Sequence, residues 1–408
     1  MNQKTLVGLA LAALVAIVIA FAVNRSNQPR SEGGGEEKAA YLVPALQDHV
    51  NDVDKVVITG AESKPIATLT RGENGWSITE KNGFAADTGK LREFLLKLAD
   101  AKLVEQKTAN KDKYATLGVE DVDGKDAKSV EIELGGLQKP VKLIVGNGNQ
   151  HGGTFVRRSG EAESWLASGT LSVDKKIESW LRKDLADVAA TRIASVEITR
   201  PDGKSVRLAK AAEADANFKL ADIPKGRDAG SDFAINGPAS TLGGLKFDDA
   251  VSAKDAPPAE KPLKARFATF DGLIVDMTAW EKDGKDYAQF VASEDEKTAS
   301  AHADAEQANP KPASADATSK SAPAEAPRPD AAADPVKDRD AKIAALKKEV
   351  DDLNARFKDW TFVLPAYKYA AINKSPDDFL KPIEDKNAAK KEGVDAKKAP
   401  PAKRPKAG

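Results

Sequence analysis

The sequence predicts an α+β protein: an N-terminal transmembrane helix followed by repeated β-β-β-α units with antiparallel sheets. Three observations predict this class. Short apolar strands separated by turn signals precede an amphipathic helix, and the same order of elements returns later in the chain. The third observation is an uncharged, proline-free run from Thr5 to Val23, which as a helix of about 28 Å matches the hydrocarbon core of a bilayer.

The first unit starts with two short apolar strands at 56–58 and 67–70. Asn74-Gly75 is a hairpin turn signal, and residues 76–79 alternate apolar and polar as a third strand. A helix should follow, with Asp87 or Thr88 as its N-cap. Its apolar residues at helical spacing are Leu91, Phe94, Leu95 and Leu98.

The unit recurs with a nearly constant offset. Val56 and Val196 are 140 positions apart, and Trp76 and Phe218 are 142 apart. We expect the second helix at 236–245, weakened by its glycines and proline. The offset indicates an internal duplication.

Between the two copies, residues 129–166 read as an antiparallel meander of alternating and apolar strands. A short amphipathic helix should follow, because its apolar residues recur at helical spacing. These residues are Ile177, Trp180, Leu181 and Leu185.

A third unit is predicted after the second, with strands at 266–270, 273–280 and 287–291. Its expected tryptophan strand appears only at 360–364. The segment 293–340 between them is rich in Ala, Pro, Asp and Glu and has almost no large apolar residue, so we expect it to be disordered. We interpret it as an insertion at a surface turn.

A helix from Asp340 to Asp359 should follow the insertion. It has a narrow apolar stripe, which favours pairing with one surface. Either the stripe packs on the chain's own sheet, which we expect because Phe357 is close to Trp360, or it docks a partner protein. The stripe consists of Ile343, Leu346, Val350, Leu353 and Phe357.

These elements divide the chain into eight segments. They are a membrane anchor (1–25), a linker (26–52), a first unit (53–120), a middle meander and helix (128–187), a second unit (190–252), a third, interrupted unit (262–292 with 341–383), a disordered insertion (293–340) and a disordered basic tail (384–408).

The N-terminal run has two interpretations. Ala20-Phe21-Ala22 resembles a signal-peptide cleavage site, but the run is long for a signal peptide, so we expect an uncleaved anchor. The predicted location is therefore a bacterial inner membrane, crossed once, with the soluble body in the periplasm. Thr5 to Val23 would be the contact with that membrane.

The composition excludes several classes of protein. The 62 Lys and Arg nearly cancel the 63 Asp and Glu, so no overall field favours nucleic acid. The absence of cysteine excludes disulfides, thiolate catalysis and cysteine metal sites. We expect no cofactor.

The candidate sites all have simpler structural explanations. The glycine-rich loop 146–153 lacks a P-loop ending and precedes a strand, so a hairpin loop is favoured over phosphate binding. His49, His151 and His302 lie far apart and in no catalytic or metal motif. The basic tail could touch anionic lipid or a protein, but a solvated tail is favoured.

The acidic pairs and the tryptophans also have simpler explanations than catalysis or ligand binding. Asp351-Asp352 is expected on the exposed side of the stripe helix, and Asp377-Asp378 at a helix start. The tryptophans are expected mostly in cores rather than stacked on cell-wall sugars. We therefore predict no catalytic, cofactor-binding or metal-binding residue. The residues considered are Asp248-Asp249, Asp351-Asp352, Asp377-Asp378, Trp76, Trp165, Trp180, Trp280 and Trp360.

Several runs resemble a bacterial domain-of-unknown-function family of membrane-anchored, repeat-containing envelope proteins, encoded beside ABC transporters of the gliding-motility auxiliary type. The resemblance covers about residues 41 to 290 and 360–364. This chain departs from the family in the long insertion and the basic tail. It implies no catalytic residue. The runs that carry it are 76–78, 84–87, 90–101, 114–119, 143–146, 154–158 and 180–185.

From these observations we expect a non-enzymatic, membrane-anchored extracytoplasmic accessory or scaffold protein. The resemblance implies a protein partner in an envelope ABC transporter complex. The alternative is a binding module for a cell-wall or lipid ligand, which a concave apolar pocket would favour. A hydrolase is the third reading, and it would need His49 or His151 beside a serine and a carboxylate.

Overall fold

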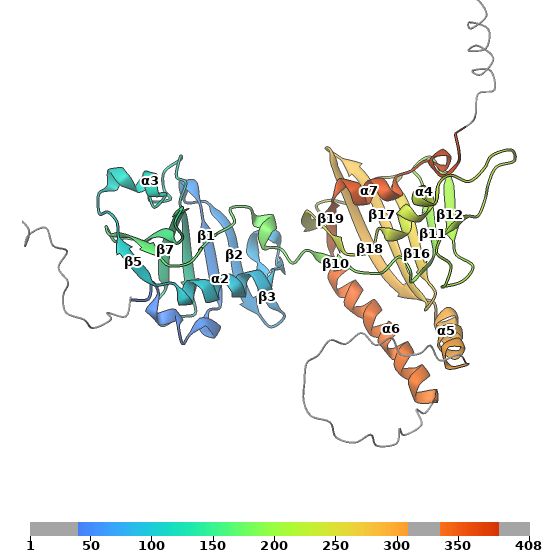
Figure 1. Ribbon diagram of the computed structural model, residues 1–408, viewed down its shortest axis with the longest axis horizontal. Helices are drawn as coiled ribbons and strands as arrows, with labels where there is room; N and C mark the ends of the chain where they lie inside the picture. The colour runs from blue at the N-terminus through green and yellow to red at the C-terminus, as the bar shows by residue number, and fades with distance from the viewer. Residues whose placement is uncertain (1–39, 309–334, 383–408) are drawn as a thin grey trace, which may run out of the picture.

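The computed structural model describes residues 40–308 and 335–382. They form an α+β protein in which all strand pairs are antiparallel. Two large sheets lie side by side, as the blue-to-green and yellow-to-red lobes of Figure 1 show. The predicted anchor Thr5 to Val23, residues 26–39 of the predicted linker and the tail from residue 384 lie outside the described residues. The rest of the predicted linker, residues 40–52, is part of the fold: it forms the 3-10 turns η1 (Pro44–Leu46) and η2 (Val50–Asp52), and Leu42, Val43 and Leu46 are buried because they pack into the core of the first sheet. No helix within the described ranges is long and apolar enough to cross a membrane.

The first sheet has the order β4-β3-β2-β1-β6-β7-β8-β9-β5 within the described residues. Helix α2 (Thr88–Asp100) packs against it, and Asp87 caps the helix by accepting a hydrogen bond from the Lys90 N–H, as predicted. The strands are β1 (Lys55–Thr59), β2 (Pro65–Gly72), β3 (Gly75–Ile78), β4 (Phe84–Ala85), β5 (Leu103–Gln106), β6 (Val130–Gly135), β7 (Val141–Gly148), β8 (Thr154–Arg158) and β9 (Ser164–Ala167).

The second sheet has the order β13-β12-β11-β16-β17-β18-β19-β15 among the described residues. Two short helices, α4 (Asp232–Asn236) and α7 (Ala366–Ile372), lie over it in Figure 1. The strands are β11 (Ile193–Thr199), β12 (Ser205–Ala209), β13 (Lys219–Leu220), β15 (Asp249–Ser252), β16 (Leu263–Thr269), β17 (Leu273–Lys282), β18 (Lys285–Glu294) and β19 (Trp360–Leu364).

The two sheets repeat one topology, except that, in the part of the chain that the structure describes, β4 at the edge of the first has no counterpart in the second. The order β3-β2-β1-β6-β7-β8-β9-β5 corresponds to β13-β12-β11-β16-β17-β18-β19-β15. The registers of the matching strands agree. Val56 on β1 pairs with Leu69 and Leu134, and its counterpart Val196 on β11 pairs with Leu208 and Phe267. We call residues 41–181 copy 1 and residues 184–380 copy 2.

The duplication extends beyond the sheets. The first residues of each copy pair with the residues just before the edge strand β5 or β15. Tyr41 bridges Lys102 in copy 1, and β10 (Asp184–Ala186) pairs with β14 (Leu245–Lys246) in copy 2. A segment following each last strand also closes over the copy. Leu181 bridges Ala86 in copy 1, and Leu380 bridges Ala229 in copy 2.

The prediction of three units is therefore wrong, although the duplication of the first unit is real. The middle meander belongs to copy 1, and the predicted third unit supplies the second half of copy 2. Trp76 and Phe218 do occupy equivalent positions. Arg71, which pairs with Trp76 in the sheet, lies over the Trp76 ring, and Lys210 lies over the Phe218 ring in the same way. Trp360 instead lies at the start of β19, the counterpart of β9, so resemblance between short strands misplaced it.

The predicted bounds or types of four segments differ from those in the structure. The predicted disordered insertion starts too early, because β18 runs to Glu294 and helix α5 spans Glu296–Ala308. Helix α6 spans Pro335–Phe357, so it begins before Asp340. The helix expected at 236–245 is α4 followed by the 3-10 turn η7 (Gly237–Ser240). Only a 3-10 turn, η6 (Ile177–Trp180), forms where an amphipathic helix was expected, and Leu185 lies in β10.

Candidate functional site

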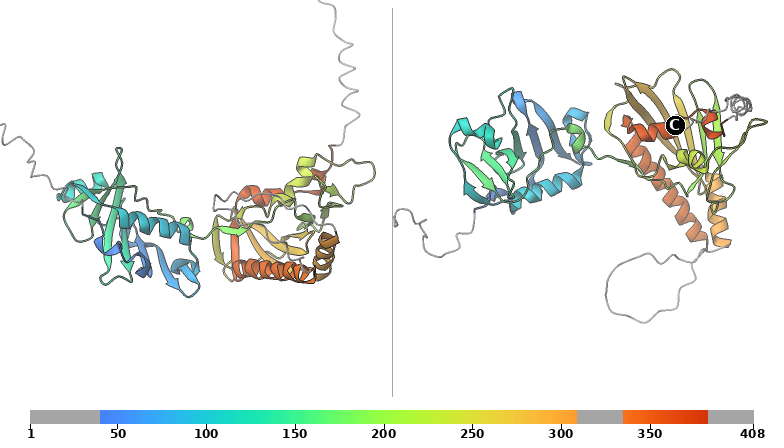
Figure 2. Two further views of the ribbon diagram at one scale, coloured as in Figure 1. Left: turned by 60° about the horizontal axis from the view of Figure 1, so that its bottom comes forward. Right: turned by 45° about the horizontal axis from the view of Figure 1, so that its top comes forward.

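Helices α5 and α6 occupy the one connection that differs most between the copies. In copy 1, residues 159–163 join β8 to β9, whereas in copy 2 residues 295–359 join β18 to β19. Helix α6 runs along copy 2 and α5 lies beside its far part, below the sheet in Figure 1 and along the lower edge of copy 2 in the left view of Figure 2. We call α5 and α6 the arm.

The arm is held on the sheet by the predicted apolar stripe. Leu346, Val350, Leu353 and Phe357 are buried, and the Phe357 ring lies 5.3 Å from that of Phe290 on β18. Asn354 accepts a hydrogen bond from the Ala292 N–H and donates one to the Ala292 carbonyl, both at 2.8 Å. Because β19 pairs with β18 only at residues 286–288, Asn354 satisfies backbone groups that the sheet leaves unpaired. The stripe therefore packs on the chain's own sheet, as expected.

A turn of copy 2 fits against the start of α5. Gly272 has φ of 93°, and a Cβ there would lie 2.9 Å from the Ala299 Cβ, so only glycine fits. Asp295 caps α5 by accepting hydrogen bonds from the Lys297 and Thr298 N–H groups. The cap at Asp295 and the glycine at position 272 together fix the start of α5 at this point of the fold.

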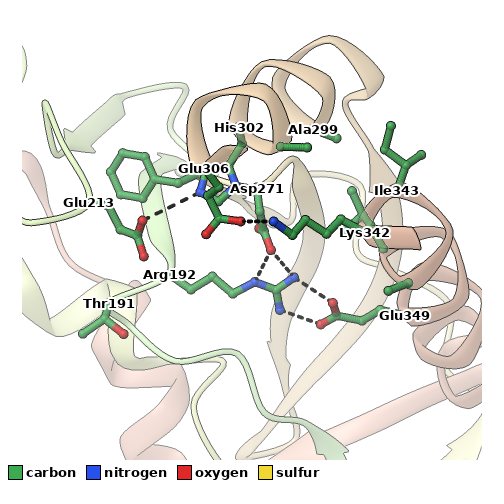
Figure 3. Close-up of a pocket in the computed structure, with 14 residues that line it drawn as sticks. Thr191, Arg192, Glu213, Asp271, Ala299, His302, Glu306, Lys342, Ile343 and Glu349 are labelled. Atoms are coloured by element: carbon green, nitrogen blue, oxygen red, sulfur yellow. Dashed lines mark hydrogen bonds and ion pairs between the residues drawn. The ribbon is translucent and has the colours of Figure 1, made fainter. Parts of the chain in front are cut away.

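A pocket of about 470 Å³ opens where the arm meets the β16–β17 turn. Figure 3 shows its charged side chains converging from the arm and from the sheet. Alanines of α5 and Ile343 and Leu346 of α6 provide an apolar wall. The lining is Thr191, Arg192, Glu213, Phe270, Asp271, Ala299, His302, Ala303, Glu306, Lys342, Ile343, Ala345, Leu346 and Glu349.

Arg192 is the central charged group of this pocket. Its two terminal nitrogens donate to the two carboxylate oxygens of Glu349 on α6, both at 2.7 Å, and its Nε donates to Asp271 Oδ2 at 2.8 Å. These bonds raise the pKa of Arg192, with Glu349 as the largest cause. Burial would raise the pKa of Asp271, but Arg192 and Thr269 outweigh it and lower the pKa. Arg192 thus ties the arm to copy 2 as a fixed ion pair.

The remaining charged groups form weaker pairs at the rim. The Lys342 Nζ lies 3.0 Å from Glu306 Oε2, which joins α6 to α5 and raises the pKa of Lys342. The His302 Nε2 lies 3.7 Å from Glu213 Oε2. His302 was expected in a disordered segment and instead lies on α5. The pocket is thus an apolar hollow bordered by charges that already have partners.

The other sequence candidates lie elsewhere. His49 pairs with Asp52 at 2.6 Å on the surface of copy 1, and His151 lies in the exposed loop between β7 and β8. Asp249 pairs with Lys81, Asp352 with Lys348, and Asp377 and Asp378 start the turn η8 (Pro376–Phe379).

The glycine-rich loop is a β-hairpin connection. Gly152 and Gly153 have positive φ, as expected for a hairpin loop. A Cβ at Gly146 would lie 2.5 Å from the Leu117 carbonyl, so this glycine lets a crossing segment lie against β7. Of the tryptophans, Trp180 and Trp280 are buried, whereas Trp76, Trp165 and Trp360 are half-buried.

Sequence reasoning missed Arg192, Asp271 and Glu349. Arg192 and Glu349 are 157 positions apart, and nothing local in either segment marks the pair. Only the position of the arm, which the sequence placed in part within a disordered insertion, brings them together.

The fold and the pocket define an α+β protein made of two copies of one antiparallel unit, the second bearing a helical arm. A family model described as a domain of unknown function, DUF4340, matches residues 76–266. This match covers a little under half of the chain, begins in β3 of copy 1 and ends in β16 of copy 2. The comparison with curated proteins found no match, and neither did the comparison with solved structures.

Proposed function

We propose that this protein is a non-enzymatic scaffold, anchored by Thr5 to Val23 in a bacterial inner membrane with its body in the periplasm, and that it serves an envelope ABC transporter. The observation that supports the scaffold role is the arm. It replaces a five-residue turn of copy 1, it is fixed to the sheet by Phe357, Asn354 and Arg192, and it presents a charged outer face. A rigid projection of this kind suits holding a partner at a set distance and angle.

The transporter partner is proposed from the sequence resemblance alone. The DUF4340 match supports the domain-of-unknown-function part of that resemblance. The arm lies within the departure from the family, so a test must ask whether the arm itself meets a transporter subunit.

The experiment uses the absence of cysteine from the chain. The full-length variants Ala305→Cys on α5 and Ala344→Cys on α6, both exposed positions, are labelled with a maleimide photocrosslinker in intact membranes. We expect an adduct containing an ABC transporter subunit, identified by mass spectrometry. The matched control is Glu73→Cys in the exposed β2–β3 turn of copy 1. Equal adducts from the control and the arm would contradict the proposal.

The pocket favours a second candidate, a binding module for a cell-wall or lipid ligand. Its apolar wall with a few converging polar groups is the usual form of a small-molecule site. The variant Ile343→Trp should fill the hollow. If the candidate is correct, muropeptides or phospholipid should raise the melting temperature of the parent chain and not that of the variant.

A further inference from the structure

The two copies are joined by an interface that buries aromatic side chains. The Phe84 ring of copy 1 lies 5.5 Å from Phe247 and 4.7 Å from Trp360 of copy 2, with edge-to-face geometry. Beside them, the Lys81 Nζ lies 2.5 Å from Asp249 Oδ1. We call Phe247, Asp249 and Phe362 the socket, since they receive Phe84 and Lys81.

The duplication places the counterpart of this socket at the far end of copy 1. Asp249 pairs with Val363 in the sheet, and Glu105 pairs with Leu166 at the same place in copy 1. Phe362 lies opposite Ala288, and Trp165 lies opposite the equivalent Val156. We call Leu103, Val104, Glu105 and Trp165 the open socket.

The open socket has the exposure expected of an interface without its partner. Phe247 and Phe362 are fully buried, whereas Leu103 and Trp165 are half-buried. The Asp249 side chain is 18% exposed and the Glu105 side chain is 60% exposed. Val104, at the position of the exposed Asp248 of copy 2, is 60% exposed.

The complementary half lies at the opposite end of copy 2. The loop 221–229 follows β13 just as residues 79–86 follow β3, and Gly226 repeats the φ of Gly83, 79° against 80°. We call it the free loop. It exposes Ile223 at 43% and Lys225, which lies between Asp222 and Asp228 in sequence, whereas Arg227 donates to Asp377 and to the Lys381 carbonyl of its own chain.

The path of the chain matches at both ends. The Arg182 N–H donates to the Ala85 carbonyl where copy 1 continues into copy 2. The Lys381 N–H donates to the Asp228 carbonyl at the corresponding exit from copy 2. The free loop is therefore held in the same way as the segment that fills the socket inside the chain.

We propose that a second copy of this chain docks head to tail, with the free loop of one chain on the open socket of the next. The internal junction is the precedent for the geometry. Because Gly226 corresponds to Gly83, Lys225 lies next to the counterpart of Lys81, so this exposed lysine would face Glu105 as Lys81 faces Asp249. The exposed pair of Glu105 with Lys107 would exchange for a pair across the interface. Such a contact is heterologous, so chains add into rows or closed rings instead of stopping at pairs.

Cysteine cross-linking of the full-length chain in its membrane tests this proposal. The chain lacks cysteine, and Val104 and Ile223 are exposed, so Val104→Cys and Ile223→Cys introduce clean reporters. With a short bismaleimide, the double variant should give a ladder of dimers, trimers and longer products. A mixture of the two single variants should give dimers only, because each chain then carries one reporter.

Two controls make the result specific. The pair Glu73→Cys with Ile223→Cys should give no ladder, and Glu105→Lys should reduce the ladder about tenfold or more by placing like charges together. Adding Lys225→Glu to Glu105→Lys should restore it. No cross-linking in the mixed single variants, or cross-links formed by Val104→Cys alone, would overturn head-to-tail docking.

Discussion

Within the described residues, copy 1 and copy 2 share eight strands in one order and differ in what covers the sheet. Copy 1 has the long helix α2, whereas copy 2 has only α4 and η7 in that place. The proline and glycines of 237–244 explain the shortening, because they cannot continue an α-helix. Copy 2 compensates with α6 and α7, which its chain supplies from after β18. The strand order is thus the same in both copies, whereas the helices that pack on the sheet differ.

A single residue, Lys368, compensates for the shorter helix that covers the sheet of copy 2. Lys368 on α7 is buried, and its Nζ donates to the carbonyls of Ser240, Thr241 and Gly243 at 3.2, 2.9 and 2.7 Å. It thus satisfies the carbonyls at the end of η7, where the longer α2 of copy 1 has its own helical bonds. Burial lowers the pKa of Lys368.

The largest expected effect tests whether the closing segments are equivalent. Trp180 and Phe379 are both fully buried, and their carbonyls accept hydrogen bonds from the matching Asp87 and Gly230 N–H groups. Trp180→Ala and Phe379→Ala should each lower the free energy of unfolding by about 3–5 kcal/mol. Urea unfolding measures this. A small loss in only one variant would show that one closing segment is dispensable and break the equivalence.

The next effect concerns the junction between the copies. Phe84 is 6% exposed and packs on three aromatic rings of copy 2. Phe84→Ala should cost about 3 kcal/mol and separate the unfolding of the two copies. Hydrogen exchange followed by mass spectrometry should then show different protection in the two sheets. Unchanged, uniform protection would mean that the copies are not coupled through Phe84.

A smaller effect should follow from Lys368→Met. The change keeps the apolar stem and removes the donors, which leaves buried carbonyls without their partner and costs about 1–3 kcal/mol. The exposed Lys282→Met serves as the control and should change stability little. Equal unfolding midpoints for the two variants would contradict the compensating role of Lys368.

The smallest effect comes from a pair whose charges are swapped between the copies. Glu133 pairs with Lys142 in copy 1, and the equivalent positions of copy 2 hold Arg266 and Asp276. Both pairs are exposed, so exchanging the charges within either pair should change stability by about 0–1 kcal/mol. A double-mutant cycle by thermal unfolding would sharpen this value. A much larger coupling would show that the outer sheet face is covered by something.

The local elements were predictable because they depend on local patterns. The alternation around Trp76, the turn at Asn74-Gly75 and the helical spacing from Leu91 to Leu98 predicted β3, its hairpin and α2. The apolar stripe of α6 also predicted a helix that packs on its own chain.

The pairing of distant strands was not predictable in the same way. Trp360 follows the arm in sequence, but its register is decided by β18 and β15, so a local likeness to Trp76 placed it wrongly. Helix α5 was missed because its alanines give little apolar signal, and they are buried only through contact with the rest of the fold. The pocket around Arg192 could not be predicted for both reasons, because the arm that closes it contains α5 and contacts residues far away in the sequence.

The connection between β18 and β19 shows how this unit can grow. Lengthening it from the five residues of copy 1 to the 65 of copy 2 adds about 2 kcal/mol of loop-closure entropy, because that cost rises only with the logarithm of length. Burial of one aromatic ring such as Phe357 offsets a cost of that size. We therefore expect the matching turn at 159–163 of copy 1 to accept a grafted reporter domain at a similar entropic cost.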